Sequence, residues 1–196
     1  MEILFNNVVQ VPYKSPKVFI SVFNKEGKLL REIGALNDIN RYMAIGIPFK
    51  DTNNNYYIFL RTVGIVKKFN EYGDIIKEYN LEQIETIRKI RDDNQYNDPG
   101  IKGENLNFSW LFFNDVFFKD NRFFLLTDNH AVNDTKSLHI YTLDSELNVV
   151  DEIFSVFISD PGISSNYSNR PKFTILRNDE ILITVPKQAE VIKLFK

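Results

Sequence analysis

Short alternating stretches of apolar and polar residues, separated by polar turns, run along most of the chain. Residues 22–30 (VFNKEGKLL) have the pattern of a strand, a tight turn with glycine and a second strand. Residues 68–76 (KFNEYGDII) repeat this layout, with Gly73 in the place of Gly27. Glycine suits such a turn because the backbone there often needs a positive φ angle. The pattern predicts a repeated β-hairpin.

Two weaker copies of this hairpin follow later in the chain. Residues 142–150 (TLDSELNVV) keep the layout, but Leu147 stands where the other copies have glycine. Residues 192–196 form a truncated copy at the end of the chain. The hairpin is therefore predicted to occur four times, counting the truncated copy.

A second motif alternates with the hairpin. It consists of an apolar strand, a basic residue, a turn with Asp or Asn, and a strand that ends in threonine, as in residues 49–62, 118–127 and 176–184. Asp and Asn favour such turns because their side chains bond to nearby backbone groups. The opening residues, 1–6, resemble residues 179–184, which indicates that the chain begins inside a repeat.

The two motifs together define four strands, a to d, in each repeat. Repeats 41–80 and 108–156 are complete, repeat 1–34 lacks strand a, and repeat 172–196 lacks strand d. This order predicts an all-β, single-domain, propeller-like protein with about four antiparallel blades in a partial or open ring. A β-sandwich and an open barrel are the alternatives. The third strands are predicted at 17–23, 63–69, 137–143 and 189–195.

The hairpin FNKEGKLLREIG and its copy resemble the NHL-type repeats of six-bladed β-propellers, including bacterial propellers from cell-envelope proteins. The resemblance covers most of the chain outside residues 81–107. It implies blades, without implying a particular function. A six-bladed ring needs more repeats than this chain contains, so the resemblance implies a fragment, a shortened relative or an open arc.

Residues 81–107 form the largest insertion between repeats. Leu81, Ile84, Ile87 and Ile90 recur every three residues, with charged residues between them. This spacing predicts an amphipathic helix within 81–92. We expect Leu81, Ile84 and Ile87 to be buried where the helix covers apolar surface. A mobile lid and a docking helix for a partner are the alternatives.

The long connections all fall at one end of the predicted blades. In an up-and-down blade, the a–b and c–d turns lie at one end, and the b–c and d–a connections lie at the other. Function tends to be carried by long loops on a rigid scaffold. The b–c and d–a end is therefore the predicted functional face. Its long segments are 6–16, 34–41, 81–107, 128–136 and 157–171.

Composition narrows the classes of function. The net charge is −2 and the basic residues are scattered, which argues against non-specific binding of nucleic acid. The chain has no cysteine, so disulfides, thiolate nucleophiles and cysteine-bound metals are excluded. No apolar run approaches the roughly 20 residues of a membrane span. The compartment stays open: the cell envelope or periplasm if an export signal has been removed, and otherwise the cytoplasm.

Several polar residues on the predicted face are candidates for binding. His130 follows Asp128 and Asn129 just after a predicted strand, and Arg61 interrupts an apolar strand end where the sister repeat has Leu126. Asp and Asn oxygens suit calcium, yet no spaced ligand cluster is present, and no nucleophile elbow or phosphate-binding glycine loop occurs. No catalytic or metal-binding residue is therefore assigned. The binding candidates are Arg61, Asp128, Asn129, His130, Asp134 and Arg170.

These observations favour a non-enzymatic binding or scaffolding module that meets a protein, peptide or glycan. The alternative is a metal-dependent hydrolase or lactonase with a site on the ring axis. Missing strands at both ends of the repeat series would leave unpaired strand edges, which are templates for association. We therefore expect the chain to self-associate or to be part of a longer protein.

Overall fold

The protein is all-β, and its sheets have the strand order of propeller blades. The structure is a computed structural model, and the residues it describes contain fourteen strands in four antiparallel sheets of three, four, four and three strands. Neighbouring strands in each sheet follow one another in the chain. The predicted strand count and the two incomplete repeats are thus confirmed in this part of the chain. The described residues are 2–6, 18–35, 46–85, 87–89, 112–130, 135–159, 172–177, 180–185 and 190–194.

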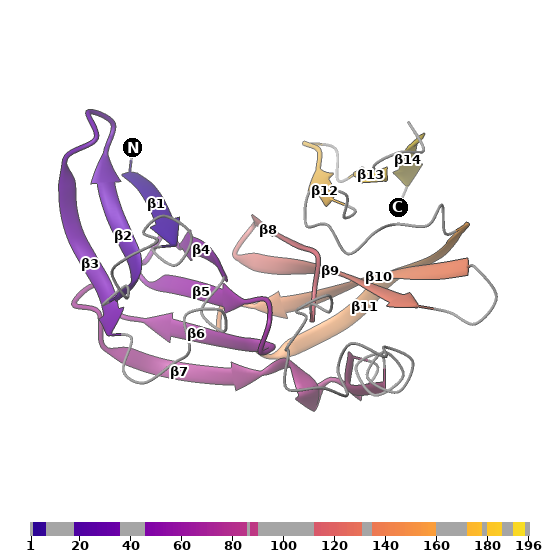
Figure 1. Cartoon of the computed structure of the whole chain (residues 1–196), viewed down its shortest axis with the longest axis horizontal. Helices are drawn as coiled ribbons and strands as arrows, with labels where there is room; N and C mark the ends of the chain where they lie inside the picture. The colour runs from indigo at the N-terminus through magenta and orange to yellow at the C-terminus, as the bar shows by residue number, and fades with distance from the viewer. Residues whose placement is uncertain are drawn as a thin grey trace, which may run out of the picture. The chain divides into compact units, whose positions relative to one another are not determined.

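The chain divides into two compact units, Met1–Leu81 and Glu82–Lys196, each with two sheets. The organisation of the chain as a single domain stays a prediction. The first unit is drawn in indigo to magenta in Figure 1. Its first sheet contains β1 (Glu2–Asn6), β2 (Val18–Asn24) and β3 (Leu29–Ala35). Its second sheet contains β4 (Gly46–Lys50), β5 (Tyr56–Leu60), β6 (Ile65–Phe69) and β7 (Ile75–Asn80).

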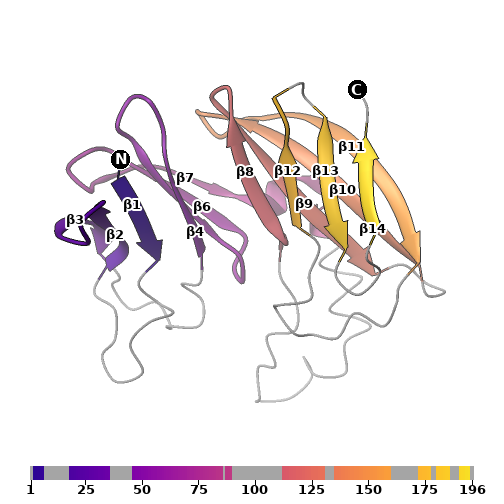
Figure 2. The ribbon, with the colours of Figure 1, turned by 90° about the horizontal axis from the view of Figure 1, so that it is seen from above.

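The second unit has the same plan with the incomplete sheet last. Figure 2 shows β12 beside β8, the first strands of its two sheets. The complete sheet contains β8 (Asp115–Lys119), β9 (Arg122–His130), β10 (Thr135–Asp144) and β11 (Val149–Ser159). The last sheet contains β12 (Lys172–Ile175), β13 (Ile181–Val185) and β14 (Glu190–Leu194). The predicted third strands correspond to β2, β6, β10 and β14.

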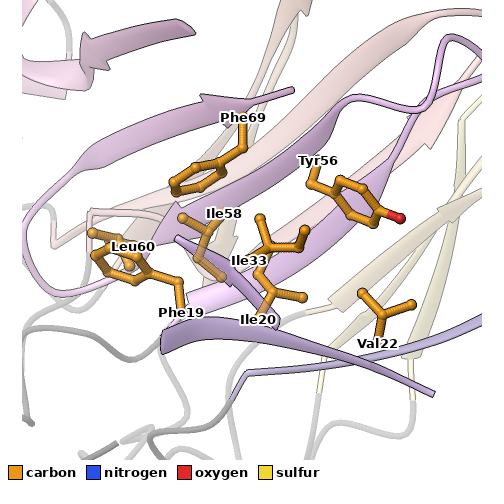
Figure 3. Close-up of a cluster of buried hydrophobic side chains, with 8 residues drawn as sticks. All are labelled: Phe19, Ile20, Val22, Ile33, Tyr56, Ile58, Leu60 and Phe69. Carbon is orange, nitrogen blue, oxygen red and sulfur yellow. The ribbon is translucent and has the colours of Figure 1, made fainter. Parts of the chain in front are cut away.

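The core of the first unit lies between its two sheets (Figure 3). Alternation along β5 sends Ile58 and Leu60 to one face, where they meet Phe19 and Ile20 of β2. Phe69 ends β6 in the same cluster, and its ring centroid lies 6.0 Å from that of Phe19. Burial of these side chains is the main force that holds the two sheets together.

The second unit has an equivalent core. Leu126 of β9 and Ile140 of β10 pack with Phe173 of β12 and Ile183 of β13. Asp115, at the start of β8, also accepts a hydrogen bond from the backbone N–H of Phe173 at 3.3 Å. Apolar packing and this polar contact together join the two sheets.

The three c–d turns of the described residues have the same hydrogen bonds. The backbone N–H of Gly27 donates to Asn24, that of Gly73 to Asn70, and that of Leu147 to Asp144. The φ angles at the three donors are +80°, +92° and +61°. Leu147 thus adopts the left-handed backbone that glycine has in the other copies. The predicted equivalence of the three hairpins is confirmed at this position.

Replacement of Gly27 by alanine is expected to lower the free energy of unfolding by about 1 kcal/mol, because an L-residue is strained at a φ of +80°. A Cβ at this position would meet nothing within 4 Å, so strain is the only cost. Urea denaturation of Gly27→Ala and Gly27→Asn checks this, with Asn expected to cost less. A loss of about 3 kcal/mol or more, well above what strain predicts, would show that the turn has a further role.

Asp51 organises the a–b turn of the second sheet. Its Oδ1 accepts from the backbone N–H of Asn53 and Asn55, and its Oδ2 accepts from the side chain of Asn55 and from the Tyr57 hydroxyl at 2.9 Å. Burial disfavours the charged form, but these hydrogen bonds outweigh it and hold the pKa of the carboxyl below its ordinary value. The predicted use of Asp in this turn is confirmed.

The lowered pKa of Asp51 makes the first unit sensitive to acid. A depressed pKa adds stability above the unfolded value of about 4, and this stability is lost as pH falls through the lower folded value. Asp51→Asn is expected to cost about 1 to 2 kcal/mol at pH 7, since an amide cannot accept all four hydrogen bonds. Denaturation at pH 7 and near pH 3 should show this gap narrowing in acid. A gap that is independent of pH would contradict the role of the charge.

The predicted insertion begins as a helix. Leu81–Gln83 form a 3₁₀ turn, η3, and residues 85 and 87–89 are helical. The N–H of Arg88 donates to the carbonyl of Ile84 at 3.0 Å. Leu81, Ile84 and Ile87 are buried, as their spacing predicts. Ile90 and the rest of the insertion lie outside the described residues.

Candidate functional site

The third sheet extends at the end where the b–c and d–a connections leave it. Its first strand, β8, has five residues, whereas β9, β10 and β11 have nine, ten and eleven. The longer strands continue past the start of β8, because Asp115 pairs with Leu126 and β9 runs on to His130. A three-stranded extension therefore projects at the predicted functional end of this sheet.

Asp128, Asn129 and His130 lie on this extension. They were predicted in a loop after the strand, within the long segment 128–136, and this position is wrong. All three are paired residues of β9, opposite Leu138, Ser137 and Lys136 of β10, and the connection is only 131–134. Their polarity does not prevent strand formation, because the ladder satisfies backbone groups whatever the side chain.

A row of polar residues crosses the base of the extension. Thr127 of β9 pairs with His139 of β10, and His139 pairs with Ser155 of β11. The Thr127 side chain is 1% exposed, and its Oγ1 makes no hydrogen bond in the described part of the chain. Directly opposite residues have Cβ atoms about 5 Å apart, so a hydroxyl and an imidazole are neighbours here.

His139 is held in place by its neighbour on the same face of β10. The His139 and Tyr141 rings are stacked, with centroids 6.2 Å apart and an interplanar angle of 14°. Tyr141 is 2% exposed and His139 is half-buried, so a fixed aromatic surface supports the imidazole. The sequence places both residues on one face of a strand, but it does not identify the pairing of His139 with Thr127.

Asn114 adds a buried polar group near this row. It directly precedes β8, is 2% exposed, and its backbone N–H donates to the carbonyl of Leu126 at 2.7 Å. Neither Asn114 nor Thr127 was among the binding candidates predicted from the sequence. Residues 114–118 (NDVFF) place a polar residue just before an apolar strand. This pattern could have identified Asn114 as a candidate.

Arg61 occupies a tight turn in the first unit. It follows β5 directly and is half-buried, and the turn is closed by the N–H of Gly64 donating to the carbonyl of Leu60 at 3.0 Å. The N–H of Leu81 then donates to the carbonyl of Gly64 at 2.7 Å. Arg61 thus lies on a short, fixed connection at the b–c end of the second sheet.

The correspondence of Arg61 with Leu126 is wrong by two residues. Phe69 and Leu143 directly precede their equivalent c–d turns, and they pair with Tyr56 and Phe123. Counted from these pairs, Arg61 corresponds to Asp128. Both repeats have a polar residue at this position. The correspondence is not visible when the two sequences are aligned on Thr62 and Thr127, the threonines at their predicted strand ends.

The binding candidates are divided between the two units, and two of them are not described. Asp134 and Arg170 lie outside the described residues. Arg61 belongs to the first unit, and Asp128, Asn129 and His130 belong to the second. Within the ranges described above, no group of three or more His, Asp or Glu residues could hold a metal ion. In the same ranges, no helix is long and apolar enough to cross a membrane.

Comparison with known proteins gives structural likenesses but no match in sequence. No protein-family model matches the chain, and no curated protein matches it. A solved structure described as streptogramin B lyase aligns with a TM-score of 0.43 and 11% sequence identity over 98% of this chain. The chain spans 58% of the length of that protein. The class that the sheets define is an all-β, propeller-like protein, and the resemblance to NHL-type repeats stays a prediction.

Proposed function

We propose that this protein is a non-enzymatic binding module that holds a peptide, a protein segment or a glycan at the b–c and d–a end of its sheets. The observation that carries the proposal is the extension of β9, β10 and β11 beyond β8. Because β10 is paired on both sides, the extension is a rigid support for residues at that end.

The polar row supports recognition of neutral hydrogen-bonding groups. The half-buried His139 imidazole can donate or accept a hydrogen bond. Thr127 and Tyr141 are buried, and they support His139 from within the sheet, Tyr141 through ring stacking. Backbone amides and sugar hydroxyls are ligand groups of matching chemistry, since sites of this kind combine apolar surface with a few fixed polar groups.

The opposite end of the sheets is less suited to a ligand. There, Asn24 Oδ1 accepts from the N–H groups of Glu26 and Lys28, and Asn70 Oδ1 accepts from those of Tyr72 and Asp74. Side-chain groups in these turns are thus used to stabilise the turns themselves. This contrast favours the extended end as the binding surface.

A selection experiment tests the proposal. The whole chain is used to select from a displayed peptide library and to probe a glycan array, and the recovered ligand is measured by calorimetry. We expect the combined Asp128→Ala, Asn129→Ala and His130→Ala variant to weaken binding about tenfold or more, which is about 1.4 kcal/mol. The control is Thr52→Ala with Arg177→Ala, two exposed turn residues at the other end, and its affinity should not change.

Two results would contradict the proposed function. One is a failure to recover any ligand from both libraries. The other is a recovered ligand that binds the triple variant as tightly as the natural chain. Amide hydrogen exchange in β9 and β10 shows that the triple variant keeps the sheet, so that loss of binding is not loss of fold.

A further inference from the structure

Two equivalent hairpins in the first unit expose apolar side chains at sheet edges. We call residues 24–31 hairpin one and residues 70–77 hairpin two. Leu29 and Leu30 of hairpin one are 47% and 45% exposed, and Ile75 and Ile76 of hairpin two are 51% and 50% exposed. They begin β3 and β7, the last strands in the order of their sheets. Exposed apolar edge strands are templates for pairing with another chain.

The turns of the two hairpins carry opposite charges at matching positions. Aligned on Gly27 and Gly73, Lys25 corresponds to Glu71 and Lys28 corresponds to Asp74. All four side chains belong to exposed residues. The apolar pairs that follow are alike, whereas the charges at these two turn positions are reversed. Of the other charged positions, Glu26 aligns with Tyr72, and Arg31 and Lys77 are both positive. The two hairpins are therefore complementary in charge at these turn positions and matched in apolar surface.

Hairpin two does not meet the turn of hairpin one within the unit. A Cβ at Gly73 would lie 3.5 Å from the backbone nitrogen of Gly34 and 3.7 Å from the carbonyl oxygen of Glu32. Hairpin two thus contacts the far end of β3, away from Lys25 and Lys28. Tyr72, at the tip of hairpin two, is 81% exposed.

We propose that hairpin one of one molecule packs against hairpin two of a second copy of this chain. Side-by-side packing with the turns at the same end places Lys25 toward Glu71 and Lys28 toward Asp74. The same alignment places Leu29 and Leu30 against Ile75 and Ile76. A second copy is the fitting partner because this chain itself supplies both surfaces, with one spacing of charged and apolar residues. The two hairpins belong to the first unit and the extended end of the third sheet belongs to the second, so the proposed contact does not depend on the proposed binding function.

Charge reversal tests the contact. Sedimentation velocity of the whole chain is measured up to about 100 µM, a range that detects weak association. The natural chain should self-associate, and association should weaken as salt screens the exposed charges. Lys25→Glu with Lys28→Asp should weaken association about tenfold or more, and so should Glu71→Lys with Asp74→Lys. Lys172→Glu, an exposed change in β12, is the control and should leave association unchanged.

Mixing the two charge-reversed variants is the decisive step. Each alone has like charges across the contact, whereas a mixture restores opposite charges between hairpin one of the first variant and hairpin two of the second. We therefore expect a heterocomplex as stable as the natural one to within a fewfold. Recovery of association also shows that both variants are folded. A monomeric natural chain, an association that ignores charge reversal, or a mixture that stays monomeric would each overturn the proposal.

Discussion

Gly34→Ala is expected to destabilise the first unit by about 2 to 4 kcal/mol, more than an ordinary surface substitution. The φ angle of Gly34 is +69°, which strains any L-residue. A Cβ there would also lie 2.5 Å from Cε1 of Phe69 and 3.1 Å from Cδ2 of Phe19. Phe69 is fully buried between the sheets, so its ring cannot turn away into solvent.

Gly27→Ala is the matched control for Gly34→Ala. Both positions have a positive φ, but a Cβ at position 27 meets nothing within 4 Å. The difference between the two variants isolates the overlap with the core from the backbone strain. Urea denaturation gives the free energies, and hydrogen exchange should accelerate in β2, β3 and β6 while β9 and β10 stay protected. Equal losses at positions 27 and 34 would show that Phe69 moves freely.

The double variant Gly34→Ala with Phe69→Leu sharpens the same prediction. Leucine removes the ring atoms nearest to position 34, so the cost of the added methyl group should be smaller beside it. Residues in contact show such coupling, of about 0.5 to 3 kcal/mol, whereas distant sites are additive. Strict additivity of the two changes would contradict the overlap of the alanine methyl group with the Phe69 ring.

The repeat architecture was predictable because its signals are local. The c–d turns depend on a few residues, with Asn or Asp accepting from the backbone and a positive φ three positions later. The alternation of apolar residues on either side then fixes which face of each strand is buried. This is why Leu147 could be assigned to the glycine position from sequence. The buried positions of Leu81, Ile84 and Ile87 were predictable from their spacing for the same reason.

Strand ends were less predictable, because they depend on the partner strand. The sequence motif ended its second strand at threonine, yet β5 ends at Leu60 before Thr62, and β9 continues past Thr127 to His130. Whether the ladder continues is decided by β10, which offers paired residues as far as Lys136. The polar residues around Asp128 therefore predicted a loop, although these residues are paired with β10 in the structure.

The candidate site shows the same dependence on pairing. Thr127 and His139 lie twelve positions apart in the sequence, and only the β9–β10 register makes them neighbours. Asn114 is similarly joined to β9 by a backbone hydrogen bond to Leu126, which the sequence does not show. Composition identified Asp128, Asn129 and His130 as candidates, but it could not distinguish the extended strand from a flexible connection. Fixed geometry at this end is what makes the binding proposal testable by the combined substitution of Asp128, Asn129 and His130.

Leu147 sets two effects against each other, since its backbone favours glycine and its side chain favours burial. Its φ is +61°, which costs about 1 kcal/mol for an L-residue outside glycine. Its side chain is fully buried, however, and deletion of a buried leucine side chain costs about 2 to 5 kcal/mol. Because burial contributes more than the backbone strain costs, the leucine is expected to stabilise the hairpin.

Leu147→Gly is therefore expected to destabilise the second unit by about 2 to 4 kcal/mol, although it restores the residue found in the other hairpins. Leu147→Ala should cost more, because it loses the buried side chain and keeps the strain. Urea denaturation gives this order, and hydrogen exchange should locate the effect in β10 and β11 while β5 and β6 stay protected. If Leu147→Gly were as stable as the natural chain, the buried side chain would add little. The third hairpin would then be held by its turn hydrogen bonds, as in the two hairpins where Gly27 and Gly73 have no side chain to bury.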